Sequence, residues 1–176
     1  MTKNKTKISV LKSNEINENI LNQIFLLKKQ HYKFSIISQK KWFIKNIKPA
    51  DHHIVLFNKK KLIGYNVLRK RNAQVLFRTS RKKINFLLFD TLIIDKMYRK
   101  KNLSKKIILK SNFIIKKNKT FSILICLKKM INYYQRYNWR LLDKKRILFK
   151  NLKFNKYAMI YNQEKFILED SKIKIL

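Results

Sequence analysis

The sequence predicts a single domain of mixed α/β class, spanning residues 1–176. An apolar run over 85–95 is followed by an amphipathic stretch and then by a second apolar run over 120–127. This order is typical of a β-α-β crossover that joins two parallel strands. Upstream, two helix-like stretches precede a β-hairpin pattern. A length of 176 residues suits one domain with a sizeable core.

The composition excludes several classes of protein. The chain has one Cys and one Gly, which excludes a disulfide framework, a thiolate metal cluster and a glycine-rich phosphate loop in its usual spelling. No signal-peptide-like stretch opens the sequence, and no apolar run approaches 18 residues. We therefore expect a cytoplasmic protein with no membrane span.

The charge has two explanations, and both stay open. The 44 Lys and Arg residues outnumber the 9 Asp and Glu residues, which gives a net charge of +35. Lys, Asn, Ile, Phe and Tyr are abundant while Gly, Pro and Ala are scarce, as A/T-rich codons alone would produce. The other explanation is a partner rich in phosphates, such as nucleic acid, an anionic membrane surface or a phosphorylated cofactor. Because the basic residues are spread along the whole chain, a dedicated nucleic-acid arm is not favoured.

The first third of the chain predicts one strand and two helices. Residues 7–11 alternate between apolar and polar, as a strand does. A helix follows to Gln30, with Asn14 as its candidate N-cap. A second helix is expected over 38–47, because Pro49 stops it.

A hairpin follows, with strands at 53–57 and 62–68 around a polar turn. Residues 73–77 predict another short extended piece, and 85–95 a strand buried on both faces. The next helix begins at Leu103 or Ser104. Its expected buried side consists of Ile107, Ile108, Phe113, Ile114 and Ile115.

The C-terminal third predicts a second buried strand over 120–127 and a short helix over 128–137. Two final strands are expected, one from Leu141 onward and one over 154–161. The predicted order of elements is therefore β, α, α, β, β, β, α, β, α, β, β.

The junction between the strand at 85–95 and the helix that follows has features of a phosphate site. A helix N-terminus presents unpaired N–H groups, which suit an anion. Arg99, Lys100 and Lys101 add positive charge at this point. The alternative is a basic loop that is simply solvated.

Two segments resemble signatures of the GNAT superfamily of N-acetyltransferases. Arg99-Lys100-Lys101-Asn102-Leu103-Ser104 is similar to the acetyl-CoA signature Q/R-x-x-G-x-G/A, with Asn102 and Ser104 in place of the small residues. Downstream, 134–139 (YQRYNW) is similar to the pattern Y-x-x-x-G-[FWY], again with Asn for Gly. Asn tolerates a left-handed backbone better than most residues, so both turns can keep their shape.

The resemblance implies a fold and a cofactor. The fold would have a mixed, mostly antiparallel central sheet with one splayed parallel strand pair, flanked by about four helices. The co-substrate would be acetyl-CoA, with its pantetheine arm on the backbone of Leu92, Ile93 and Ile94. Its pyrophosphate would bind the loop that consists of Arg99, Lys100, Lys101, Asn102, Leu103 and Ser104. No metal is implied.

The resemblance also implies direct attack of an amine on the thioester. Tyr134 matches the tyrosine of the family that protonates the leaving thiolate; otherwise it is a packed aromatic residue. Asp90 is the best acidic candidate for the base that takes the proton of the amine. Two alternatives remain, namely that Asp90 only pairs with a nearby Lys or Arg, or that water carries the proton.

His31, Trp42 and His53 are candidates for acceptor binding, because the early helices and the strand after them usually shape that site in the family. The alternative for each of them is that its side chain only packs against neighbouring residues. Adjacent histidines in a strand point to opposite faces, so His52 and His53 do not suggest one metal site. Cys126 ends a buried strand and reads as a core residue.

We therefore expect an acetyl-CoA-dependent N-acetyltransferase that acts, as a monomer or homodimer, on a small primary amine. An amino sugar or a related metabolite is slightly preferred as acceptor, and a protein amine comes next. A basic surface disfavours a polycationic acceptor and favours an anionic one. The rival function is a basic nucleic-acid-binding or ribosome-associated module with a catalytically inactive GNAT-like fold.

Overall fold

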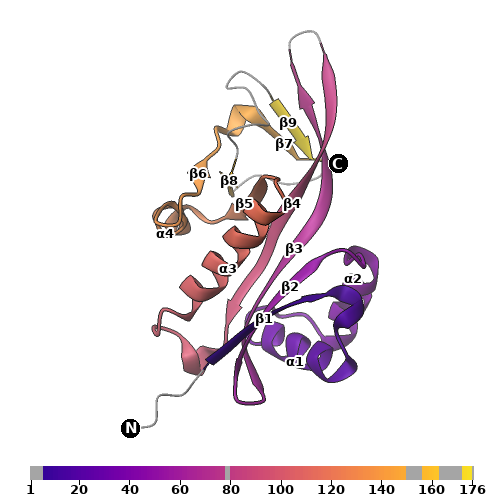
Figure 1. Ribbon diagram of the computed structural model, residues 1–176, viewed down its shortest axis with the longest axis vertical. Coiled ribbons are helices and arrows are strands. Elements are labelled where there is room, and N and C mark those ends of the chain that lie inside the picture. Colours follow the sequence, from indigo (N-terminus) through magenta and orange to yellow (C-terminus); the bar gives the residue numbers. More distant parts are fainter. Residues whose placement is uncertain (1–5, 78–79, 150–155, 163–171, 176) are drawn as a thin grey trace. The chain divides into compact units, whose positions relative to one another are not determined.

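The computed structural model describes residues 6–77, 80–149, 156–162 and 172–175 (Figure 1). The strands of this part of the chain are β1 (Thr6–Lys12), β2 (His52–Asn58), β3 (Lys61–Leu76), β4 (Arg81–Ile94), β5 (Ser122–Cys126), β6 (Arg140–Leu141), β7 (Ile147–Phe149), β8 (Tyr157–Tyr161) and β9 (Lys172–Ile175). The α-helices are α1 (Glu18–Lys29), α2 (Ile36–Asn46), α3 (Leu103–Lys117) and α4 (Ile131–Gln135).

The strands form one mixed sheet with the order β1-β2-β3-β4-β5-β8-β6, and β9 pairs with both β3 and β7. The β1–β2, β2–β3, β3–β9, β5–β8 and β6–β8 pairs are antiparallel. The expected parallel pair is present, with Leu87–Phe89 of β4 opposite Ser122–Leu124 of β5. A second parallel pair, β7 with β9, was not predicted.

The chain divides into two compact units. The first unit contains residues 1–69 and 90–111, and the second contains 70–89 and 112–176. In the first unit, α1 and α2 lie beside β1 and β2 (Figure 1).

The core of the first unit packs α1 against its strands. The apolar stripe of α1 repeats at helical spacing, so one face is buried and the other solvated. The cluster consists of Ile24, Leu27, Val55, Leu62, Tyr65, Val67 and Ile93. Gly64, the single glycine of the chain, lies where a Cβ would stand 2.8 Å from Ile107 Cδ1 and 2.9 Å from Ile94 Cδ1. A glycine at this position therefore lets α3 pack closely on β3.

The core of the second unit is a separate cluster. It consists of Ala73, Phe86, Phe121, Ile123, Leu142, Ile147, Ala158, Ile160 and Ile173. Phe86 and Phe121 stack with their ring centroids 5.7 Å apart. Ile123 belongs to the predicted second buried strand, whose side chains are enclosed except at Ile125.

Several predicted details are wrong. Asn17, not Asn14, caps α1, and its side chain accepts from the Ile20 amide. Residues 73–76 are not a separate strand, because β3 runs without a break to Leu76. Phe113 of α3 is exposed rather than buried.

The C-terminal predictions are partly outside the described residues. Of the strand expected over 154–161, residues 154 and 155 lie outside the described residues, Lys156 is a bend, and the remaining five residues form β8. The strand β9 was missed, although its sequence Lys-Ile-Lys-Ile alternates with period two. No helix in the described part of the chain is both long and apolar enough to cross a membrane.

Candidate functional site

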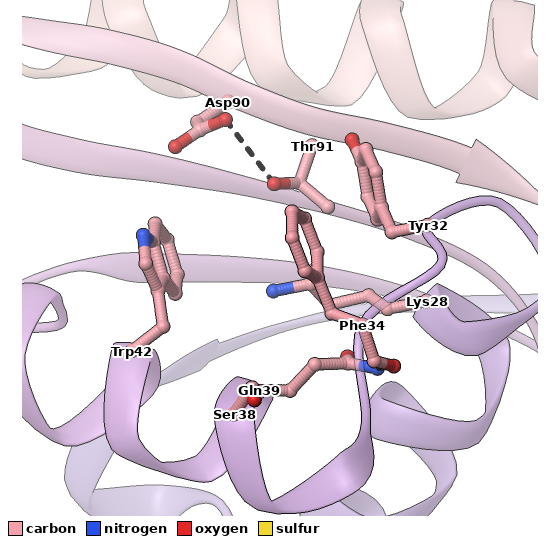
Figure 2. Close-up of a pocket in the computed structure, with 8 residues that line it drawn as sticks. All are labelled: Lys28, Tyr32, Phe34, Ser38, Gln39, Trp42, Asp90 and Thr91. Atoms are coloured by element: carbon pink, nitrogen blue, oxygen red, sulfur yellow. Dashed lines mark hydrogen bonds between the residues drawn. The ribbon is translucent and has the colours of Figure 1, made fainter.

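A pocket of about 460 Å³ lies within the first unit, between the early helices and β4. Its lining consists of Lys28, Tyr32, Phe34, Ser38, Gln39, Trp42, Asp90 and Thr91. Figure 2 shows the aromatic rings in a row, with Asp90 and Thr91 on the strand beside them. Two predicted site residues, Asp90 and Trp42, are therefore brought together in one cavity.

Asp90 is held by an arginine of the neighbouring strand. Its Oδ2 accepts from Arg69 Nη1 at 2.6 Å, and its Oδ1 accepts from the Thr91 hydroxyl at 3.1 Å. The Asp90 side chain keeps 30% of its surface exposed, against 11% for Arg69. The ion pair expected as the alternative to a base role for Asp90 is therefore present. The Asp90 carboxylate also borders the pocket.

Thr91 has a strained backbone next to this carboxylate. Its φ is 60°, in the left-handed region. A side chain branched at Cβ is unfavourable there by roughly 1–2 kcal/mol. Strain of this kind concentrates at functional sites, which supports a special role for this point of β4.

Lys28 is a buried cation in the pocket wall, with only 7% of its surface exposed. Its ammonium lies 4.4 Å from the centroid of the Trp42 ring. Burial lowers the pKa of Lys28, and the nearby Asp90 opposes this shift. Arg69 stacks on the same indole, with its guanidinium carbon 4.9 Å from the ring centroid.

The loop before α3 has the backbone that glycine normally supplies. Asn102, at the first glycine position of the acetyl-CoA signature, has a φ of 52°. Lys100 is also left-handed, with a φ of 63°. Loops of this kind turn successive N–H groups inward and can bind an anion. Arg99, Lys100, Lys101 and Asn102 are exposed, while Leu103 is buried.

Arg99 lies against His31, which follows α1. Its Nη2 lies 3.0 Å from His31 Nε2 and 3.2 Å from His31 Nδ1, and His31 Nε2 lies 3.2 Å from the Ile94 carbonyl. With Nδ1 as the acceptor and Nε2–H as the donor, the neutral ring accepts from Arg99 and donates to the Ile94 carbonyl. Burial lowers the pKa of His31, with a smaller effect of Arg99 in the same direction.

Asp95 anchors the start of the same loop. Its carboxylate accepts from the Met97 amide at 2.9 Å and forms a salt bridge of 3.0 Å with Lys61. Burial acts to raise the pKa of Asp95, but the hydrogen bonds from Met97, Lys61 and Gln30 outweigh it, so that the pKa is lowered. Asp95 therefore stays charged and holds the strand-to-helix junction.

The predicted pantetheine strand has its backbone partly engaged. Ile93 and Ile94 are buried, while Leu92 is half-buried. The Ile94 carbonyl accepts from Arg99 Nε at 3.5 Å in addition to the His31 contact.

The second predicted motif lies in the second unit. Tyr134 is 7% exposed and packs edge-on against Phe89, with ring centroids 6.0 Å apart. Asn138 stands at the glycine position of the motif that this segment resembles. Its φ is 64°, so its backbone is left-handed. The turn places Trp139 in the core, where its Nε1 donates to Asn112 Oδ1 at 3.1 Å.

His31 and His53 do not line the pocket. His53 is fully buried, with its Nδ1 2.8 Å from the Tyr65 hydroxyl and its Nε2 2.9 Å from the Ser13 hydroxyl. Sequence reasoning missed Lys28 and Gln39 of the pocket wall. The signal for Lys28 was its place four residues after Ile24, on the apolar stripe of α1.

Among the described residues, no group of three or more His, Cys, Asp or Glu side chains could hold a metal ion. Cys126 is a free, buried cysteine. Burial raises the pKa of its thiol, as expected for a core residue.

Comparison with protein-family models finds no match, and neither does comparison with curated proteins. The fold, however, is similar to many solved structures. The GNAT family N-acetyltransferase YhbS from Escherichia coli, in complex with CoA, matches with a TM-score of 0.68 and 12% identity, over 97% of this chain and 89% of that one.

Two further Escherichia coli proteins are similar. ElaA matches with a TM-score of 0.64 and 10% identity, over 89% of this chain and 99% of its own. The ribosomal-protein-S18-alanine N-acetyltransferase matches with a TM-score of 0.61 and 12% identity, over 89% of this chain and 91% of its own.

Proposed function

We propose that this chain, which has the fold of the GNAT N-acetyltransferases, is itself an acetyl-CoA-dependent N-acetyltransferase that functions as one domain over residues 1–176. The predicted fold class is confirmed. One observation supports the activity most strongly: Asn102 and Asn138 replace the glycines of two separate family motifs, and both have a left-handed backbone. The chain thus keeps the backbone that each motif needs while changing the residue that usually supplies it.

In this proposal acetyl-CoA binds along the end of β4 and the loop that follows. Backbone groups of Leu92, Ile93 and Ile94 hold the pantetheine arm, as the family resemblance implies. The pyrophosphate binds the amides and cations of the loop 99–104. The left-handed conformations of Lys100 and Asn102 support this assignment, because such a turn gathers N–H groups around an anion.

The reaction is a direct acyl transfer. The lone pair of the acceptor amine attacks the thioester carbon, the C–S bond breaks, and CoA leaves as a thiolate. As the family resemblance implies, Tyr134 donates its hydroxyl proton to that thiolate. We assign Asp90 to the acceptor side, where its carboxylate attracts the ammonium form and takes up one proton directly or through water, which frees the attacking lone pair. The amine loses a second proton on becoming an amide, and water carries that proton back to the tyrosinate of Tyr134.

The acceptor is a small primary amine that binds in the pocket of the first unit, beside Trp42. A cavity of about 460 Å³ suits a molecule of amino-sugar or amino-acid size. An amino sugar remains the first candidate. The reaction is assigned to the cytoplasm, where acetyl-CoA is available, and to a monomer or homodimer.

Calorimetric titration of the protein with acetyl-CoA tests the cofactor assignment. We expect binding, and absence of any heat or thermal shift at millimolar acetyl-CoA would remove the enzyme proposal. The rival nucleic-acid module would instead bind RNA tightly, with an affinity that falls steeply as salt is raised.

Tyr134→Phe tests the acid role. Because the variant keeps the ring and loses only the hydroxyl, we expect turnover to fall by roughly 100-fold or more while the affinity for acetyl-CoA stays nearly unchanged. Tyr133→Phe is the matched control on the same helix and should retain turnover. Unchanged turnover in Tyr134→Phe would exclude Tyr134 as the acid.

A further inference from the structure

The acceptor pocket, together with the arginine that pairs with its carboxylate, has more positive than negative charge. Two cations, Lys28 and Arg69, lie against the ring of Trp42. The single carboxylate of the pocket wall, Asp90, is paired with Arg69. Among the described residues, no carboxylate lies within salt-bridge distance of Lys28 Nζ. One positive charge thus remains without an acidic partner.

This remaining charge is poorly solvated. Lys28 is 7% exposed, and a buried ammonium that lacks a counter-ion is strongly unfavourable. The face of Trp42 compensates only in part, because a cation–π contact is worth about 2 kcal/mol when desolvated. Figure 2 shows the Lys28 nitrogen pointing toward Trp42, and both residues line the pocket. An anion that entered the pocket would meet this ammonium.

Gln39 provides a second polar group that lacks a partner. The residue is 3% exposed and lines the pocket. Its Nε2 donates to the Phe34 carbonyl at 3.3 Å, while its Oε1 has no hydrogen-bond partner in the described structure. Buried amide oxygens are rarely left unpaired, so a donor on the ligand, such as an amide N–H or a hydroxyl, would complete this group.

We propose that the acceptor is a small primary amine that also carries an anionic group, a carboxylate or a phosphate, and that Lys28 binds this group. The inference rests on the proposed transferase function for the reaction, but the binding itself does not depend on it. The two charges of the ligand match the two charged side chains that line the pocket. The anion faces Lys28, and the amine faces the carboxylate of Asp90.

Matched pairs of acceptors provide the test. Glucosamine 6-phosphate is compared with glucosamine, and phenylalanine with phenylalaninamide, so that each pair differs mainly in one anionic group. For one of the pairs, the wild-type protein should prefer the anionic member by about 30-fold in kcat/KM, since a hydrogen bond to a charged group contributes about 2 kcal/mol. The pair that shows the preference distinguishes phosphate from carboxylate.

Lys28→Met keeps the length of the side chain and removes its charge, so the preference should fall to about threefold or less. Lys28→Arg should restore part of it. Lys29→Met is the matched control, because Lys29 is the exposed neighbour on the same helix, and it should keep the full preference. Equal use of both members of each pair by the wild-type protein would overturn the inference while leaving the transferase function intact.

A binding measurement separates the two proposals. Calorimetry without acetyl-CoA should detect the anionic amine with the wild-type protein and about 30-fold weaker binding with Lys28→Met. If this difference appears but no acetyl transfer occurs, the transferase proposal fails and the anion site stands. If neither member of either pair binds, the anion site is overturned.

Discussion

His53 is uncharged at neutral pH because it lies in the core of the first unit. Burial lowers its pKa to about 4, with a smaller effect of His52 in the same direction. The unfolded chain, with a pKa of about 6.5, therefore binds more protons between pH 6.5 and pH 4. Stability must fall as the pH decreases through this window, by about 3 kcal/mol for this residue.

This gives a prediction for His53→Gln, which keeps polar groups near Ser13 and Tyr65 but cannot be protonated. Urea unfolding at pH 7 and pH 4.5 should show a loss of stability in the wild-type protein that is about 2 kcal/mol larger than in the variant. The pKa values of His31 and His52 are also lowered. Because both proteins contain these two residues, their effect on stability cancels in the comparison. An identical loss in both proteins would mean that His53 is not the buried titrating group.

At the same scale, the sequence predicted some site residues and not others. The place of Asp90 in the pocket could be anticipated because a carboxylate within an apolar strand is unusual, and that of Trp42 because the early helices usually shape the acceptor site in the family that the sequence resembles. Lys28 could not be separated from the other basic residues, since a net charge of +35 conceals a single buried cation. His53 was assigned to the acceptor site from its place near the first hairpin strand, but its ring packs against Tyr65.

At the level of elements, both turns that resemble the family motifs contain a left-handed asparagine, Asn102 and Asn138. Replacing Asn102 or Asn138 with Ala should cost about 1 kcal/mol of stability, because Ala has a Cβ and no side-chain amide to favour this conformation. Replacement with Gly should change stability by only a few tenths of a kcal/mol. Urea unfolding of the four variants measures this, and equal stability of the Ala and Gly variants would contradict it.

Local sequence patterns decide which elements could be predicted. The hairpin of β2 and β3, the start of α3 and strand β5 follow from local patterns, namely alternation, helical period and continuous apolar runs. The N-cap of α1 was predicted at the wrong asparagine, Asn14, because Asn17 also precedes the apolar stripe and local pattern does not separate the two. The β7–β9 pairing joins segments far apart in the sequence, so no local pattern specifies it.

At the level of the whole molecule, the question is whether the charge of +35 affects folding itself. Only 9 acidic residues are present to balance 44 basic ones, so most basic residues cannot be matched one to one with an acidic residue. A large net charge destabilises a compact state through self-repulsion. Salt should relieve this, since the Debye length shortens from about 30 Å at 0.01 M to about 8 Å at 0.15 M.

We therefore expect the Tm to rise by about 3 °C or more between 10 and 150 mM NaCl, corresponding to roughly 1 kcal/mol. The double variant Lys82→Glu/Lys83→Glu changes two exposed lysines of β4. Each substitution removes two units of charge, so the net charge falls from +35 to +31, and the rise with salt should become smaller. Lys82→Arg/Lys83→Arg keeps the charge and should retain the wild-type rise. Differential scanning calorimetry across the salt series measures the Tm of each protein. A Tm that stays constant or falls as salt is raised would show that the surplus charge does not reduce stability.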